Sequence, residues 1–368
     1  MTELNLLYSE LEDDLRASVR DVLTDRCDPR DVIPVYDGDR SLAVPLWSSL
    51  SQEMGLGGLL VPEDRGGAGA SAREAAVVLE ELGRAAAPVP FLTSGVIATA
   101  ALLQGDGPAA DDLLASLAAG ASTAALLVPF STAPGIATTI GRVDPDGGVG
   151  IDVTSVAGAI EADVLLVPVA LADGVALYAV PAHEASVEAV TSLDMTRPLA
   201  DVRVVGARGR PVVSPGAGET AIRRALLTGA ALLASEQLGV AQWSLATTIE
   251  HLKARRQFGR VLGGYQALKH RLADLYVSIE SAAAAARYAA AAFADDDPDR
   301  EVAAAVAQAW CSDVAVQAAE EAIQLLGGIG MTWEHPAHLF LKRAKADQIA
   351  LGTPGFHRSA LADLVDLR

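Results

Sequence analysis

The segment KARRQFGRVLGGYQALKHRLADLY, residues 253–276, joins two long helical patterns and so decides the fold of the C-terminal half of the chain. Glycines at positions 259, 263 and 264 interrupt the helical pattern. Apolar residues then recur at helical spacing, at Leu268, Leu272, Leu275 and Ile279. We therefore expect a helix-turn-helix corner that presents residues 255–258 at its tip.

The tip of this corner carries Arg255, Arg256, Gln257 and Phe258. Two guanidinium groups beside an amide and an aromatic ring suit an anionic, partly aromatic partner, such as the pyrophosphate and adenine of a dinucleotide. The alternative is a solvated basic helix end whose charges complement the helix dipole. Taken by themselves, the four residues favour this second interpretation.

The composition predicts a compact globular chain with room for two or three domains. Of the 368 residues 51% are hydrophobic and the mean hydropathy is +0.30, which excludes a disordered protein. The net charge of −19 argues against nucleic acids and anionic membranes as partners. Only Cys27 and Cys311 are present, so neither a disulfide framework nor a metal site is indicated, and a cytoplasmic location fits. The N-terminus lacks the features of a signal peptide, and Arg287 interrupts the Ala-rich run at 282–294, so we expect no export and no membrane span.

An all-helical N-terminal domain is expected over residues 1–119. Apolar residues recur at helical spacing from Leu4 onward, which predicts a first amphipathic helix with Leu7 and Leu11 on its apolar face. Ser71 and Glu74 form a capping box that begins another helix. Further helices are expected at residues 42–54, 94–103 and 109–118.

Residues 120–216 have a different character. Short β-branched runs, separated by Gly, Pro and Asp, are typical of strands and occur at residues 124–128, 149–153, 164–168, 175–180, 187–190 and 202–205. They predict a middle β-domain, either a sandwich or a barrel. A helical pattern then returns, with breaks near 259–264, 295–299, 327–330 and 352–355, so residues 217–368 are expected to form a helical bundle. The expected fold class is α+β and multidomain.

Three motifs, in this order, resemble the acyl-CoA dehydrogenases. They are VPEDRGGAGASAREAAVVLEELGRAAAPVP at 61–90, RRQFGRVLGGYQALKHRLAD at 255–274, and QLLGGIGMTWEHPAHLFLKRAKADQIALGTPGFHR at 324–358. The resemblance covers nearly the whole chain. It implies FAD as cofactor, an acyl-CoA thioester as substrate and α,β-dehydrogenation as the reaction, and it raises the dinucleotide interpretation of residues 255–258 above the alternative.

In that family FAD lies at a subunit interface, and the resemblance assigns a set of residues to its adenosine and pyrophosphate end, mostly for the flavin of the neighbouring subunit. These residues are Arg255, Gln257, Phe258, Gln266, Gln324, Gly327, Gly328 and Thr353. The residue types suit the task, because arginine neutralises phosphate, phenylalanine packs beside adenine and paired glycines admit close approach of the backbone. A helix C-cap is the alternative role of the two glycines.

Two β-domain segments depart from the family pattern. The resemblance implies that an acidic-Pro-Gly-Ser-Asp type segment and a Trp-Ile-Thr-Asn type segment bind the flavin ring and the thioester. Here the corresponding stretches read LLVPFSTAPGIATT at 126–139 and VGIDVTSVAGAI at 149–160, without the tryptophan or the Gly-Ser-Asp sequence. We therefore expect this chain to lack a ring-binding shelf of its own.

The catalytic base is missing as well. The reaction needs a carboxylate to remove the proton beside the thioester carbonyl. The family's two base positions correspond to Leu351, just before a Gly-Thr pair, and to Gly229, 26 residues before Arg255. The nearest carboxylate on that helix, Glu236, lies seven residues or roughly 10 Å further along the axis. We expect it to be an ion-pair partner or a solvated residue, and Asp347 to be a surface acid or a salt-bridge partner.

Two classes of function remain. In the first, the chain is a non-catalytic subunit of a heteromeric enzyme, resembling the paired-subunit acyl-CoA dehydrogenases that act on steroid side-chain thioesters. It would assemble with a second acyl-CoA dehydrogenase-like subunit as an α2β2 heterotetramer. In the second, it is a flavin-free structural or regulatory relative, although the retained Arg255, Phe258 and Gln324 argue against this. A homomeric dehydrogenase with a relocated base is a third and weaker hypothesis.

Overall fold

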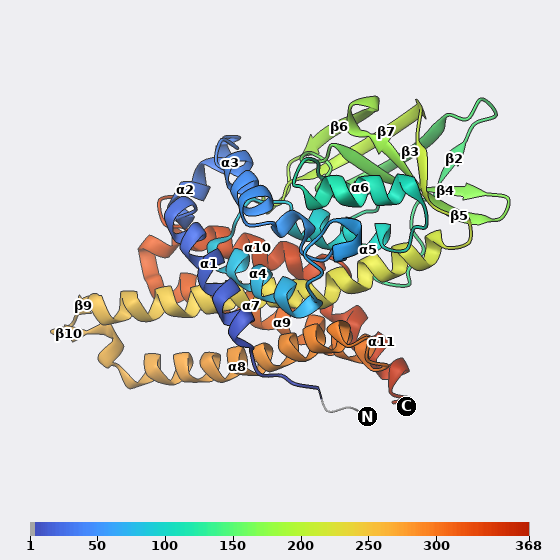
Figure 1. The fold of residues 1–368 in the computed structure, drawn as a ribbon. Helices are drawn as coiled ribbons and strands as arrows, with labels where there is room; N and C mark the ends of the chain where they lie inside the picture. Colours follow the sequence, from blue (N-terminus) through green and yellow to red (C-terminus); the bar gives the residue numbers. More distant parts are fainter. Residues whose placement is uncertain (1–3, 368) are drawn as a thin grey trace.

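The computed structural model describes residues 4–367, in which N-terminal helices, a mixed β-sheet and a C-terminal helical bundle follow one another (Figure 1). This order confirms the expected fold class. The N-terminal elements are α1 (Glu10–Arg26), α2 (Pro29–Val32), η1 (Ile33–Asp37), α3 (Ala43–Ser48), η2 (Ser49–Glu53), η3 (Leu56–Gly58), η4 (Glu63–Arg65), α4 (Ala72–Ala85), η5 (Phe91–Ala98), α5 (Thr99–Leu102) and α6 (Pro108–Ala118).

The first helix differs from the prediction in its start and in its buried face. Helix α1 begins only after Ser9, because Ser9 and Glu12 cap each other's backbone N–H groups. The predicted start at residue 4 is therefore wrong. Leu7 and Leu11 are 77% and 66% exposed rather than buried. The Arg73 guanidinium binds both carboxylate oxygens of Glu12, at 2.9 and 2.8 Å, so a paired acid faces α4 instead of a leucine.

The middle region contains a single eight-stranded mixed sheet. Its strands are β1 (Ala124–Leu126), β2 (Gly141–Val143), β3 (Val149–Ala157), β4 (Val164–Leu171), β5 (Gly174–Pro181), β6 (Ala185–Val190), β7 (Leu199–Ala207) and β8 (Arg210–Val213), with a short η6 (Ala182–Glu184). The order is β6-β7-β3-β2-β4-β5-β8, and β1 pairs in parallel with β4. The β-branched runs predicted six of these strands. The short β2 and β8 were not predicted.

The central strand β4 is buried on both faces, which fixes how the sheet sits on the helices. Leu165, Val167 and Val169 pack into a core that the sheet makes with its own strands β3 and β7. Leu166, on the other face, packs into the large core formed by the helices. The β-domain is thus held against the helices by the same strand that organises its interior.

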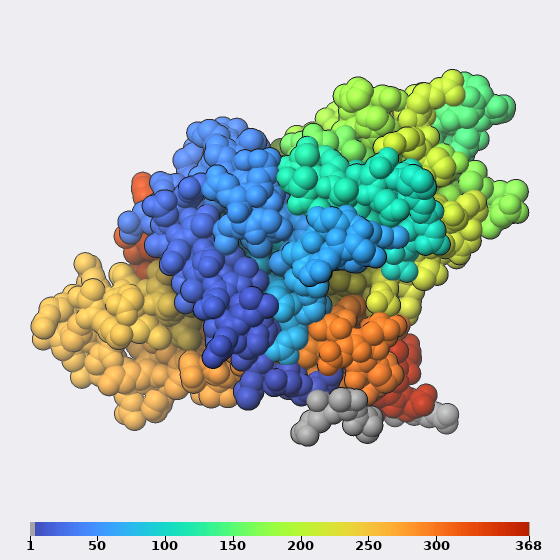
Figure 2. All heavy atoms as spheres, viewed as in Figure 1, coloured from blue at the N-terminus to red at the C-terminus, as the bar shows by residue number. Residues whose placement is uncertain are grey.

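The C-terminal elements are α7 (Gly218–Ala254), β9 (Arg256–Gln257), β10 (Arg260–Val261), η7 (Leu262–Gly264), α8 (Gln266–Ala294), α9 (Arg300–Leu326), η8 (Gly327–Met331), α10 (Ala337–Ile349) and α11 (Pro354–Leu364). The predicted corner between α7 and α8 ends in the two-stranded antiparallel hairpin β9–β10. This hairpin projects from the left edge of the molecule in Figures 1 and 2. Within residues 4–367, no helix combines the length and the apolarity that a bilayer crossing needs.

Helices α4 and α7 cross with their backbones in close contact. A Cβ atom added at Gly239 would lie 2.0 Å from the Glu80 carbonyl oxygen, and one added at Gly83 would lie 2.1 Å from that of Glu236. Glycine is therefore required on both helices at this crossing. The contact sets the position of the middle of α7, which carries Glu236 toward α10.

Candidate functional site

The hairpin exposes the residues predicted to bind the pyrophosphate. Arg255, Gln257 and Phe258 are all exposed, and Phe258 reaches 88%. No ion pair or side-chain hydrogen bond among residues 4–367 involves Arg255. Phe258 also has a φ of 52°, the left-handed region that bulky residues rarely adopt. An aromatic ring is thus held in solvent on a strained backbone next to an arginine without a partner in this part of the chain.

The first turns of α8 and the last turns of α9 lie side by side near this hairpin. The Arg271 and Glu321 side chains form an ion pair of 2.7 Å between the two helices. Gln266, which begins α8, places its Nε2 atom 3.3 Å from His270 Nε2. Gln324 is exposed one turn after Glu321. The structure therefore brings Gln266 and Gln324 to one end of the bundle.

The two glycines that follow α9 have open space around them. A Cβ atom added at Gly327 or at Gly328 would meet no atom within 4 Å. Gly327 has a φ of 67°, so its own backbone explains the glycine as a helix terminator. Gly328 has no positive φ, and neither packing nor conformation within residues 4–367 requires glycine there. Close approach by a group outside the chain would account for it.

Thr353 is not part of this group. Its hydroxyl oxygen accepts a hydrogen bond of 3.2 Å from the Phe356 N–H and so caps α11. Figure 1 shows α11 at the opposite end of the bundle from the hairpin. In a single chain, Thr353 is therefore separated from the other seven residues predicted to bind the cofactor.

The structure places the two family base positions next to each other. A Cβ atom added at Gly229 would lie 3.0 Å from Leu351 Cδ1 and 2.8 Å from Ile97 Cγ1. Leu351 is buried, its N–H donates to the Phe130 carbonyl at 2.8 Å, and its own carbonyl oxygen lies 3.0 Å from His357 Nε2. The space where a carboxylate would project from either position is filled by the leucine and the isoleucine.

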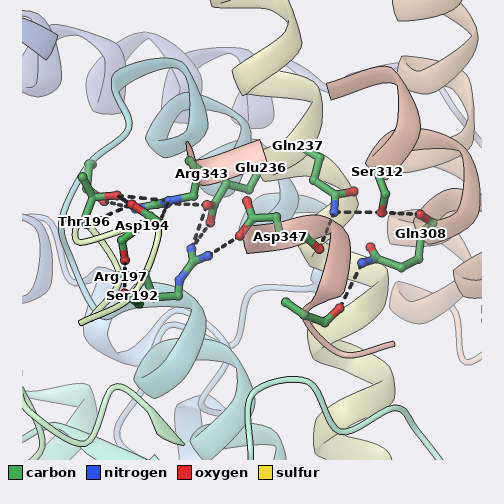
Figure 3. A network of polar contacts seen from close by, with 12 residues as sticks. Ser192, Asp194, Thr196, Arg197, Glu236, Gln237, Gln308, Ser312, Arg343 and Asp347 are labelled. Atoms are coloured by element: carbon green, nitrogen blue, oxygen red, sulfur yellow. Dashed lines mark hydrogen bonds and ion pairs between the residues drawn. The ribbon is translucent and has the colours of Figure 1, made fainter. Parts of the chain in front are cut away.

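Glu236, the carboxylate nearest to Gly229 along α7, is held in a buried ion-pair cluster. It is buried between two guanidinium groups, with Arg197 bound to both of its oxygens at 2.7 and 2.5 Å and Arg343 bound to one (Figure 3). Burial alone would raise its pKa, but the two arginines together hold the pKa of Glu236 below its ordinary value. A carboxylate held in this way is a weak base and is shielded from substrate.

Asp347 belongs to the same buried cluster, so the expectation of a surface acid is wrong and that of a salt-bridge partner is right. Its Oδ1 accepts from Arg197 at 2.6 Å, and Arg343 binds Asp194 at 2.6 Å. Three buried carboxylates thus share two guanidinium groups (Figure 3). Burial and the Glu236 carboxylate raise the pKa of Asp347 to about 8.

The two segments expected to bear a ring-binding shelf meet at a small cavity. The Phe130 N–H donates to the Ser155 carbonyl at 2.9 Å, which joins residues 126–139 to residues 149–160. The cavity has a volume of about 220 Å³ and is lined mainly by Phe130, Ser155, Arg197 and Ile349. Cofactor pockets usually measure about 300–1,000 Å³. No cluster of metal-binding side chains occurs anywhere in residues 4–367.

Comparison with known proteins establishes the family. The models for the N-terminal and C-terminal domains of acyl-CoA dehydrogenases match residues 9–121 and 216–365. The chain is 36% identical over 341 residues to acyl-CoA dehydrogenase IpdE2 of Mycobacterium tuberculosis, which covers 92% of each protein. The chain belongs to the acyl-CoA dehydrogenase family. This confirms the resemblance carried by the three sequence motifs.

Two solved structures similar to this acyl-CoA dehydrogenase homologue have titles that each name two proteins. One is a variant of the Tcur3481-Tcur3483 steroid ACAD, with a TM-score of 0.83, 29% identity and coverage of 97% of this chain and 98% of that one. The other is the ChsE4–ChsE5 complex of Mycobacterium tuberculosis, with a TM-score of 0.87 and coverage of 99% and 100%. Its identity of 23% supports a shared fold alone.

Sequence reasoning missed two features of this acyl-CoA dehydrogenase homologue. Ile97 fills the base site, but nothing in its local pattern marks it. Arg343 is buried with its guanidinium in the acid cluster, and the only available signal was a charged residue within the apolar pattern of α10. Both features arise from contacts between residues far apart in the sequence.

Proposed function

We propose that this chain is a non-catalytic subunit of a heteromeric FAD-dependent acyl-CoA dehydrogenase. It would contribute Arg255, Gln257 and Phe258, with Gln266, Gln324 and the Gly327–Gly328 pair, to the adenosine and pyrophosphate end of a flavin. The flavin ring and the base would belong to a second acyl-CoA dehydrogenase-like subunit, in an α2β2 assembly. The observation that carries the proposal is the packing of Gly229, Leu351 and Ile97 against one another at the base site.

The residues of this chain fit one end of FAD and not the other. Arg255 has no partner among residues 4–367, and Gly328 leaves its backbone open to a ligand, so both suit a diphosphate and its nucleoside. The cavity beside Phe130 is below the usual size for a cofactor pocket, and the space at Gly229 is closed by Leu351 and Ile97. When bound, FAD supplies the two-electron acceptor for dehydrogenation.

The work of this chain's own residues would be binding and orientation. Arg255 would neutralise the pyrophosphate through a guanidinium fork, and Phe258 would cover the adenine ring. Gln266 and Gln324 would donate amide hydrogen bonds from the adjoining ends of α8 and α9. Thr353 lies away from these residues in one chain, so its predicted role requires a flavin bound at a different interface.

The proposed substrate is an acyl-CoA thioester whose acyl group is the side chain of a steroid. Support comes from the 29% identity to a structure described as a steroid ACAD, which extends over 97% of this chain. We also propose a cytoplasmic location, because Cys27 and Cys311 are both free and buried thiols, as is common in a reducing compartment.

The test is to express this chain alone and together with an acyl-CoA dehydrogenase-like chain that retains the glutamate, and to measure FAD absorbance and acyl-CoA oxidation. We expect the lone chain to carry little or no FAD and to be poorly soluble, and the pair to be yellow and active. A lone chain that purifies fully flavinylated and active would support a homomeric enzyme instead. A flavin content of the pair that is indifferent to Arg255→Ala would support the flavin-free relative.

A further inference from the structure

The Lys342 ammonium group lies between two aromatic rings. Its Nζ atom is 4.0 Å from the centre of the Tyr36 ring and 3.9 Å from that of Trp333, close enough for two cation–π contacts. The His338 ring lies 4.8 Å from Trp333 and 5.7 Å from Tyr36, measured between ring centres. No ion pair among residues 4–367 involves Lys342. We call Tyr36, Trp333, His338 and Lys342 the lysine clamp.

The hydrogen bonds of the lysine clamp require a neutral His338. Lys342 Nζ lies 3.3 Å from His338 Nδ1, and an ammonium group can only donate, so Nδ1 must accept. The ring proton then sits on Nε2, which lies 3.3 Å from the Trp333 carbonyl oxygen and donates to it. A second proton on the ring would place two donors face to face at Nδ1 and would add a cation beside Lys342.

The lysine clamp connects a firmly held part of the molecule to the turn η8. The Tyr36 hydroxyl donates to Asp194 Oδ1 at 3.3 Å, and Asp194 is fixed by Arg343 in the buried acid cluster. Trp333, at the other side of the clamp, is 63% exposed and is the second residue after η8. The contacts of its ring and its carbonyl with Lys342 and His338 are therefore one restraint on the segment that contains Gly327 and Gly328, beside the packing of Gly330 against the end of α9.

We infer that Lys342 and His338 are positioning residues that hold Trp333, and through it the turn η8, in the arrangement that the dinucleotide uses, and that acid opens the lysine clamp. The role toward the dinucleotide rests on the proposed function. The opening of the clamp does not, because it follows from the contacts within this chain.

The charges around His338 determine the direction of the pH response. Lys342 and His335 face it from its own segment and Tyr36 from η1, while Asp194 from the loop before β7 attracts Lys342. Arg30 in α2 and His251 in α7 act on the cluster through His335. Burial, and then Lys342, lower the pKa of His338. The closed clamp is therefore complete at neutral pH, and its contribution is lost as the pH falls through this lowered pKa.

The test is hydrogen exchange of residues 327–333, followed by mass spectrometry in the assembled complex and corrected for the intrinsic effect of pH. Measurements at about pH 8 and about pH 5 bracket the ordinary histidine pKa of about 6.5. We expect exchange to rise about tenfold in acid, as for the loss of one or two cation–π contacts. His338→Gln can accept from Lys342 and donate to the Trp333 carbonyl at either pH, so exchange should stay slow at both. Lys342→Met should exchange fast at both, and Lys342→Arg should restore slow exchange at the higher pH.

His335→Gln is the matched control, because His335 Nδ1 accepts from the Ala337 N–H and forms no hydrogen bond with Lys342 or Trp333 among residues 4–367. It should keep the wild-type pH response. Equal exchange in acid and base for the wild type, or a pH response that persists in His338→Gln, would overturn the inference. If exchange responds as expected but FAD release from the complex does not follow it, the clamp stands and its role toward the cofactor is refuted.

Discussion

The hairpin end of the molecule has polar side chains without partners, whereas the interior beside Gly229 is closely packed but has no acidic side chain at its two candidate base positions. At the hairpin, Arg255 and Phe258 are exposed and have no side-chain partners within residues 4–367, so side chains that could bind a ligand are left without one. At the base site, Leu351 and Ile97 are buried and closely packed, and neither side chain can accept a proton. On the proposed function, the exposed polar groups serve the flavin of a partner subunit, and the closely packed interior has no catalytic role.

Two glycines, Gly229 and Gly328, show the same contrast in what an added Cβ atom would meet. A Cβ atom added at Gly229 would press on Ile97 at 2.8 Å, while one added at Gly328 would meet nothing within 4 Å. The first glycine is needed by the chain's own packing, and the second is not. Substitutions at these and neighbouring positions therefore separate effects on folding from effects on the cofactor.

The largest expected effect is that of Gly229→Glu. A glutamate there must displace Leu351 and Ile97 and bury a carboxyl group, which should lower the free energy of unfolding by about 3 kcal/mol or more. Urea denaturation followed by circular dichroism measures it. Gly229→Ala is the control and should cost less, because it adds one methyl group against Ile97 and Leu351 and buries no carboxyl group. A fully stable Gly229→Glu protein would mean that the base site is open.

Leu351→Glu should come next. It replaces a buried leucine that has a φ of 54°, and we expect a loss of about 2–4 kcal/mol with no gain in acyl-CoA oxidation by the assembled complex. The reason is the expectation that segments 126–139 and 149–160 provide no ring-binding shelf opposite position 351. Leu351→Met keeps the volume and should lose less than about 1.5 kcal/mol. Higher turnover together with an extra equivalent of FAD would show that the site is nearly complete.

Arg255→Ala should affect the cofactor and spare the fold. Loss of one charge-assisted contact to pyrophosphate is expected to cost about 1.5–3 kcal/mol, or roughly tenfold to a hundredfold in FAD affinity. Arg255→Lys should restore part of this, because it keeps the charge and not the fork. Arg260→Ala on the same hairpin removes an arginine that stacks 3.6 Å from the Tyr265 ring centre, and it should leave affinity unchanged. If Arg255→Ala keeps its full FAD content after dialysis, Arg255 is a solvated residue at a helix end and does not bind the cofactor.

Asp347→Asn tests the buried acid cluster through the pH dependence of protein stability. Burial and Glu236 raise the pKa of Asp347 in the folded protein above the ordinary value of 3.8 that applies to the unfolded chain. The wild type therefore loses stability as the pH rises above this value, and the variant should not. We expect Asp347→Asn to be more stable than the wild type at high pH and this difference to disappear in acid, with FAD content unchanged. A gain that is equal at all pH values would contradict a raised pKa of Asp347.

The smallest effect on stability should come from Gly328→Ala. Its added methyl group enters open space, so the free energy of unfolding should change by less than about 0.5 kcal/mol. FAD affinity should still fall, because the methyl group occupies the space through which the backbone approaches the ligand. Thermal melts and FAD titration of the same preparation measure the two. Unchanged affinity would restrict these glycines to ending α9.

Local sequence patterns predicted the order of the fold, and long-range contacts explain what they missed. The corner after α7 follows from glycines that interrupt helical spacing, and six strands follow from β-branched runs. The start of α1 follows from a local capping box, Ser9 with Glu12, which apolar spacing alone does not reveal, whereas the burial of Glu12 depends on Arg73, 61 residues away. The burial of Glu236 depends on Arg343, 107 residues away. Such pairs leave no periodic signal, so the sequence left open whether Glu236 and Asp347 are ion-pair partners or surface residues.

The most direct test of the central claim is the number of flavins in the assembled complex, counted from FAD absorbance after denaturation against the amount of each chain. One FAD for each pair of unlike chains is the result predicted for a subunit that supplies the adenosine end and has no ring site of its own. One FAD for every chain, with the second flavin reducible by substrate, would contradict the account and would require a complete site beside Leu351.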